Sequence, residues 1–133
     1  MYLDLTVFQK ALNSLKAAII KYNQDVSDDM IRDSVIQRFE YTYGLAIKMI
    51  ERFLQTTSTL DVDTLSFNQL IRDANERGVL LGNLENWAEY RKKRNITSHT
   101  YDETKALEVV SIMDDFIKET EFLLNKLKEK NES

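Results

Sequence analysis

An arginine, a histidine and a tyrosine stand close together in residues 94–101, which read Arg-Asn-Ile-Thr-Ser-His-Thr-Tyr. His99 is the only histidine of the chain, and imidazole is the side chain that most readily exchanges a proton near neutral pH. The Arg94 guanidinium can hold a phosphate through paired hydrogen bonds and stabilise charge that develops on it. Together the two side chains could cleave RNA without a metal, with Arg94 binding the scissile phosphate. His99 would act as base on a ribose 2′-hydroxyl or as acid on the leaving oxygen.

The spacing of these residues limits how they can meet. In a regular helix the step from Arg94 to His99 turns by about 140°, so the two side chains would point to different sides. Arg94 and Tyr101 would share one face. Either the helix ends before His99, or the site combines residues from two chains related by a twofold axis. The capping-box spacing of Thr100 and Glu103 favours the first arrangement because it predicts a new helix start.

The cations before His99 form the run Arg91, Lys92, Lys93 and Arg94, in a chain whose net charge is −4. A broad nucleic-acid interface normally shows as a basic face and a high pI. We therefore expect contact with RNA to be local, through Arg91, Lys92 and Lys93 beside Arg94. The plainer alternatives are a solvated basic face, a histidine that caps a helix or lies on the surface, and a Tyr101 that packs at a turn.

The sequence shows no Gly-rich phosphate loop, metal-spaced cluster or nucleophile elbow. We therefore expect neither a metal nor a cofactor. The length of 133 residues fits a single domain over residues 1–133. The chain has no cysteine, which removes disulfides and fits a reducing compartment. No signal peptide or run of ~18 apolar residues is visible, so we expect a cytoplasmic location without membrane contact.

The composition favours helices because the chain has no proline, three glycines and many strong helix formers. Apolar residues recur at steps of three and four residues, which is the helical period. They predict long helices over 3–22, 28–55 and 103–130, a short helix over 67–77, and a second short one from Asn83. The wide apolar arc of helix 28–55 indicates either a central position or a subunit contact. We expect an all-α, antiparallel up-and-down bundle with three long and two short helices.

Polar residues mark several predicted helix ends. Ser27 or Asp28 is suited to cap the second helix, and Ser66 with Gln69 has the spacing of a capping box. Gly78 is a candidate for a left-handed C-terminal cap. Residues 56–65 are predicted to form a loop, and residues 128–133 a frayed tail.

Residues 94–101 fit the Arg-x4-His-x-Tyr motif of HEPN-domain proteins. More narrowly, the chain resembles the small stand-alone HEPN proteins encoded beside a minimal nucleotidyltransferase. These are called nucleotidyltransferase substrate-binding proteins or HepT toxins of HEPN/MNT toxin–antitoxin pairs. Residues 33–42 resemble the second helix of that family, and residues 72–74 with Gly78 resemble its short third helix.

The resemblance implies a helical bundle that forms homodimers, with the arginines and histidines of both protomers near a shared cleft. It implies a metal-independent ribonuclease, in which Arg94 and His99 occupy the catalytic positions. It also implies a partner nucleotidyltransferase that neutralises the toxin and in some pairs transfers AMP from ATP to the motif tyrosine, here Tyr101. The alternatives are a non-catalytic substrate-binding subunit of a minimal nucleotidyltransferase and a purely structural helical adaptor.

Overall fold

The computed structural model describes residues 2–59 and 61–132, so expectations at Met1, Leu60 and Ser133 lie outside the described residues. The described residues contain no strand, which confirms the all-α prediction. None of their helices is long and apolar enough to cross a membrane. They form six α-helices and two 3₁₀ turns: α1 Thr6–Gln24, α2 Asp29–Thr57, η1 Val62–Thr64, α3 Phe67–Glu76, α4 Leu84–Asn95, η2 Thr97–His99, α5 Glu103–Val110 and α6 Met113–Glu132.

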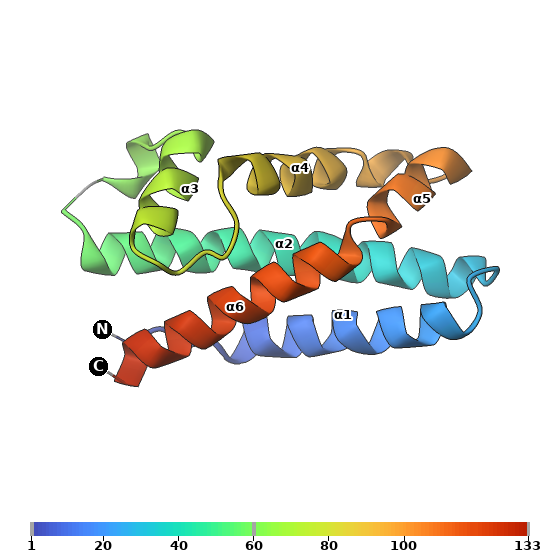
Figure 1. Ribbon diagram of the computed structural model, residues 1–133, viewed down its shortest axis with the longest axis horizontal. Coiled ribbons are helices and arrows are strands. Elements are labelled where there is room, and N and C mark those ends of the chain that lie inside the picture. Colours follow the sequence, from blue (N-terminus) through green and yellow to red (C-terminus); the bar gives the residue numbers. More distant parts are fainter. Residues whose placement is uncertain (1, 60, 133) are drawn as a thin grey trace.

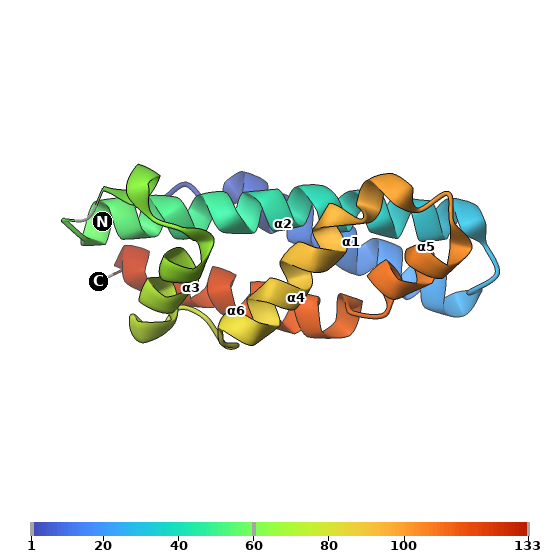
Figure 2. The ribbon, with the colours of Figure 1, turned by 90° about the horizontal axis from the view of Figure 1, so that it is seen from above.

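The helices are arranged around α2, the longest of them (Figures 1 and 2). α1 runs antiparallel to α2, and α6 crosses both diagonally. α3, α4 and α5 follow one another along the side of α2 that faces away from α1. α2 therefore has the central position, one of the two alternatives that its wide apolar arc indicated. The two ends of the chain meet, where the Asn131 side chain bonds the backbone N–H and C=O of Leu3 at 2.8 and 2.9 Å.

Side-chain caps fix where most of these helices begin. Asp28, rather than Ser27, caps α2 by accepting two N–H groups of its first turn. The predicted capping box of Ser66 and Gln69 is present at α3, and Asn83 forms another at α4. Gly78 has φ of +80°, the left-handed conformation expected after a helix.

The predicted helix 103–130 is wrong as one element, because it breaks into α5 and α6 at Ser111 and Ile112. The hydroxyl of Ser111 donates to the carbonyl of Glu108 at 2.6 Å, a local bond that competes with helix continuation. The buried residues on either side, Val109 and Met113, keep helical spacing. The periodicity therefore continues through the break, and the bundle has three short helices instead of two.

A cluster of aromatic rings holds α4 against the centre of the bundle. Trp87 and Tyr90 of α4 are buried, and their rings meet edge to face at 5.4 Å. The Tyr90 ring contacts Phe116 of α6 at 5.4 Å, which in turn contacts Phe39 of α2 at 4.8 Å. Burial raises the pKa of Tyr90 to about 12, so this ring stays neutral. The position of the basic end of α4 is thus set by packing.

A buried carboxylate fixes the connection between α3 and α4. Glu119 of α6 is only 1% exposed, and its two oxygens accept the backbone N–H groups of Leu81 and Gly82, each at 2.7 Å. Burial raises the pKa of Glu119, while these two bonds act in the opposite direction. The sequence reading did not anticipate this residue, because it sits within an apolar stripe.

Replacing Gly82 by alanine should destabilise the fold by about 1–3 kcal/mol, the usual cost of overpacking. The new Cβ would lie 2.6 Å from Oε1 of Glu119 and 2.8 Å from Oδ1 of Asn86. Both oxygens are held by hydrogen bonds and cannot move away freely. Urea unfolding followed by circular dichroism measures the change. Asn125→Ala, at an exposed position of α6, is the control, and a Gly82→Ala stability equal to it would contradict the role assigned to this contact.

Candidate functional site

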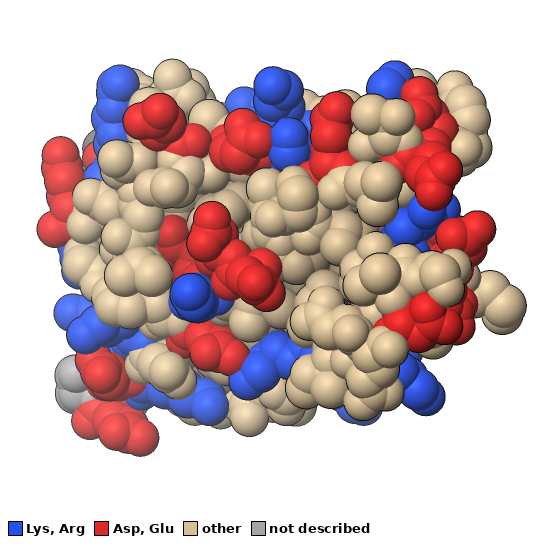
Figure 3. All heavy atoms as spheres, turned by 45° about the vertical axis from the view of Figure 1, so that its right-hand side comes forward, with Lys and Arg blue, Asp and Glu red and all other residues tan. Residues whose placement is uncertain are grey.

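The four consecutive cations of α4 point in different directions because successive helical residues are about 100° apart. The Arg91 guanidinium lies over the ring of Phe67 in α3, 4.6 Å from its centroid. Lys92 is exposed, Lys93 is buried, and Arg94 faces α2. On the face in Figure 3, lysine and arginine atoms are interspersed with aspartate and glutamate. A continuous basic patch is therefore absent from that face.

The ammonium of Lys93 pairs with two carboxylates that are themselves about half exposed. Its Nζ lies 2.8 Å from Glu89 on the same helix and 4.0 Å from Glu108 of α5. Its hydrogen bond lowers the pKa of Glu89. The Lys93 side chain is only 10% exposed, so its ammonium is poorly placed for the RNA contact expected of it. Its position indicates that it joins α4 to α5.

Lys93→Ala should therefore lower the free energy of unfolding by about 1–2 kcal/mol, because packing of the aliphatic stem and the ion pairs are lost together. Lys92→Ala should leave stability within about 0.5 kcal/mol, as expected for an exposed position. Thermal and urea unfolding of both variants provide the measurement. Equal stabilities for the two variants would show that neither the packed stem of Lys93 nor its ion pairs contribute to stability.

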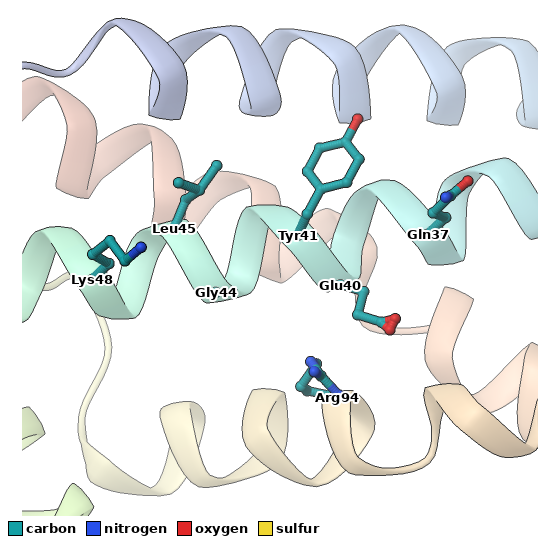
Figure 4. A pocket seen from close by; sticks show the side chains of 7 residues that line it. All are labelled: Gln37, Glu40, Tyr41, Gly44, Leu45, Lys48 and Arg94. Atoms are coloured by element: carbon teal, nitrogen blue, oxygen red, sulfur yellow. The ribbon is translucent and has the colours of Figure 1, made fainter.

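Arg94 lines an open hollow between α4 and α2, with a volume of about 610 Å³. In Figure 4 the Arg94 side chain extends from α4 toward α2, and Glu40 extends from α2 toward α4. Tyr41 points toward α1, where its hydroxyl bonds Oγ of Ser14 at 2.8 Å. The hollow is large enough for a phosphate and part of a nucleotide. The residues around it are Gln37, Glu40, Tyr41, Gly44, Leu45, Lys48 and Arg94.

His99 lies on the short turn η2, beyond the end of α4 at Asn95. The helix therefore ends before the histidine, which is the first of the two arrangements that the spacing of Arg94 and His99 allows. The predicted capping box at Thr100 is wrong, because Asp102 caps α5 by accepting the N–H of Thr104. The Thr100 hydroxyl instead donates to the carbonyl of Thr97 at 3.1 Å, which tightens the turn. His99 is exposed at the end of this turn.

Tyr101 projects from the surface beside His99. It is 88% exposed, which contradicts the alternative of a packing residue. Its ring is edge-on to the imidazole of His99, with 6.3 Å between the centroids. A group added to Tyr101 would therefore be attached to a ring that lies next to the histidine.

Two residues that the sequence reading did not select join the hollow to the turn. Thr97 is buried at the start of η2, and its Oγ1 lies 2.8 Å from the carbonyl of Arg94 and 3.3 Å from Oε2 of Glu40. Glu40 precedes Thr97 by 57 positions, so no local sequence signal could have paired them. Among the described residues, no group of three His, Cys, Asp or Glu side chains is placed to hold a metal ion.

The fold and the site define a small helical bundle that presents an Arg-x4-His-x-Tyr segment at the end of its fourth helix. Residues 3–129 match the family model described as nucleotidyltransferase substrate binding protein like. The chain belongs to this family. The resemblance inferred from the sequence is therefore confirmed at the family level.

One named relative and two solved structures are similar to the chain over most of its length. It is 36% identical to a Haemophilus influenzae protein named probable ribonuclease HepT, over 98% of this chain and 95% of that protein. A solved Haemophilus influenzae structure, described as the fold of a substrate binding domain of a nucleotidyltransferase, matches with a TM-score of 0.86 and 35% identity. That match covers 94% of this chain and 99% of the other. A Thermus thermophilus structure matches with a TM-score of 0.72 and 30% identity, covering 90% and 98% of the two chains.

Proposed function

We propose that this chain is the toxin of a HEPN/MNT toxin–antitoxin pair. In this proposal it is a metal-independent ribonuclease that acts as a homodimer in the cytoplasm. A small nucleotidyltransferase neutralises it and uses Tyr101 as an AMP acceptor. The observation that carries the proposal is the placement of Arg94 in an open hollow and of His99 on the exposed turn that follows directly. The similarity to a protein named probable ribonuclease HepT supports it.

The reaction requires two proton transfers. The ribose 2′-oxygen attacks the adjacent phosphorus, the bond from phosphorus to the 5′-oxygen breaks, and a 2′,3′-cyclic phosphate and a 5′-hydroxyl result. A base takes the proton of the 2′-hydroxyl, and an acid gives a proton to the leaving 5′-oxygen. Each chain has one histidine. In a twofold dimer His99 of one protomer would be the base and His99 of the partner subunit the acid, while Arg94 holds the phosphate.

The face of α2 beside Arg94 is suited to pairing with a second copy. Gln37, Tyr41, Gly44 and Lys48 are exposed along it, and no heavy atom lies within 4 Å of the position that a Cβ on Gly44 would take. A second α2 can therefore approach closely at this point. A twofold axis along this face would bring two copies of Arg94 to one cleft.

Expression of this chain alone should arrest the growth of a bacterial host, and Arg94→Ala should relieve the arrest. The guanidinium is the group placed to hold the scissile phosphate, and it points into the hollow from the helix surface. Growth curves at equal soluble protein levels provide the measurement. Lys92→Ala, one residue away and exposed, is the matched control and should reduce toxicity less. Arrest that persists undiminished with Arg94→Ala would remove this residue from the mechanism.

The second candidate is a non-catalytic substrate-binding subunit of the nucleotidyltransferase. The exposure of Tyr101 favours it, because an acceptor hydroxyl must reach the partner's active site. The similarity to a structure described as a substrate binding domain of a nucleotidyltransferase supports it too. This candidate predicts complex formation and modification of Tyr101 without RNA cleavage by the unmodified chain.

A further inference from the structure

The turn that carries His99 is attached to the rest of the bundle through the side chain of Thr97. This side chain is 8% exposed, and its Oγ1 lies between two acceptors from different helices. One is the carbonyl of Arg94 at the end of α4, and the other is Oε2 of Glu40 in α2. A hydroxyl has a single proton, so the two acceptors share it in a three-centre hydrogen bond.

Glu40 also belongs to the hollow that contains Arg94. Its carboxylate projects from α2 into the space between α2 and α4, into which the Arg94 side chain also extends (Figure 4). Glu40 therefore contacts the start of η2 from within the hollow into which Arg94, the candidate phosphate-binding residue, also points. Among the described residues that line the hollow, it is the only one whose side chain hydrogen-bonds to η2.

We propose that Glu40 is a positioning residue, which through Thr97 sets the orientation of the His99 turn relative to Arg94. Its chemical role rests on the proposed ribonuclease function, whereas the structural link does not. Two helices rather than one then determine where the imidazole lies. This matters because a displacement of about 1 Å between groups that act on one phosphate can cost about 10²-fold in rate.

The single histidine provides a direct measurement of this link. In an NMR spectrum of the full chain, the imidazole Cε1–H group gives one histidine signal, which belongs to His99. Glu40→Ala and Thr97→Val should both shift this signal, because each removes one partner of the same hydrogen bond. Their effects should be non-additive in the double variant. Glu40→Gln and Thr97→Ser should restore the parent signal, since each retains an oxygen at the required place.

Glu51→Ala is the control, since it removes a carboxylate from α2 about three turns away from Glu40 and outside the hollow, and it should leave the His99 signal unchanged. Circular dichroism and unfolding curves check that each variant is folded. If Glu40→Ala and Thr97→Val leave the folded protein's His99 signal at the parent position, the inference is overturned. The same holds if Glu51→Ala shifts it equally.

RNA cleavage is measured separately on the same proteins. We expect Glu40→Ala to lower the turnover rate about 10-fold to 100-fold with little change in RNA affinity, because Arg94 remains in place. Glu40→Gln should recover most of the rate. If the parent chain does not cleave RNA but Glu40→Ala and Thr97→Val shift the His99 signal, the proposed function is wrong and the structural link is supported. If the parent chain cleaves RNA and Glu40→Ala cleaves it at the same rate, the positioning role is wrong and the proposed function is unaffected.

Discussion

Replacing His99 by alanine is expected to lower the rate of RNA cleavage by about 10²–10⁴-fold, the range that a positioned acid or base contributes. His99 is the only imidazole that the chain offers. In the proposed dimer the substitution removes both the base and the acid, which places the expected loss toward the upper end of that range. The products of the parent reaction should carry a 2′,3′-cyclic phosphate, because the 2′-oxygen is the nucleophile.

The control for this experiment lies in the adjacent residue. Ser98 is exposed on the same turn, so Ser98→Ala should leave the rate near that of the parent. Because His99 is exposed, His99→Ala should change the free energy of unfolding by no more than about 0.5 kcal/mol. A time course of labelled RNA cleavage, in the presence of a metal chelator, gives the rates. Cleavage by His99→Ala at the parent rate would show that another group transfers the proton.

Much of the fold could be predicted because long helices leave strong local signals. The helix starts near Asp28, Ser66 and Asn83 follow from caps whose partners lie within the next three residues. The break at Ser111 could not be predicted in this way. Val109 and Met113 keep one apolar face across it, and the direction of α6 is set by packing on α1 and α2.

The candidate site was predictable in its residue types and only partly in its geometry. The spacing of Arg94 and His99 allowed either a helix end between them or a site shared by two chains, and α4 does end there. The sequence could not show that Lys93 is buried against Glu89 and Glu108, because a run of cations looks the same whichever face each one occupies. The contact of Glu40 with Thr97 was hidden for another reason, since it joins two distant parts of the chain.

Tyr101→Phe should abolish the transfer of AMP to this chain by its nucleotidyltransferase partner. In that reaction the phenolic oxygen attacks the α-phosphorus of ATP. The bond between this phosphorus and the oxygen that bridges to the β-phosphate breaks, and pyrophosphate leaves. The phenolic proton passes to a base of the partner. Phenylalanine keeps the ring and lacks the nucleophile. Tyr101 is 88% exposed, so the substitution should not disturb the fold. Intact-protein mass spectrometry after incubation with the partner and ATP measures the loss of one adenylate.

Tyr41 provides the matched control because it is also partly exposed, while its hydroxyl is bonded to Ser14. Tyr41→Phe should be adenylylated like the parent, and an adenylate found on Tyr101→Phe would place the acceptor elsewhere. Modified parent protein should also lose RNA cleavage. The adenylate would be attached to a ring centred 6.3 Å from the His99 ring, where its negative charge repels an RNA phosphate and its bulk fills the approach. Modification of a chain that never cleaved RNA would instead favour the substrate-binding subunit, since the adenylate would then have no activity to suppress.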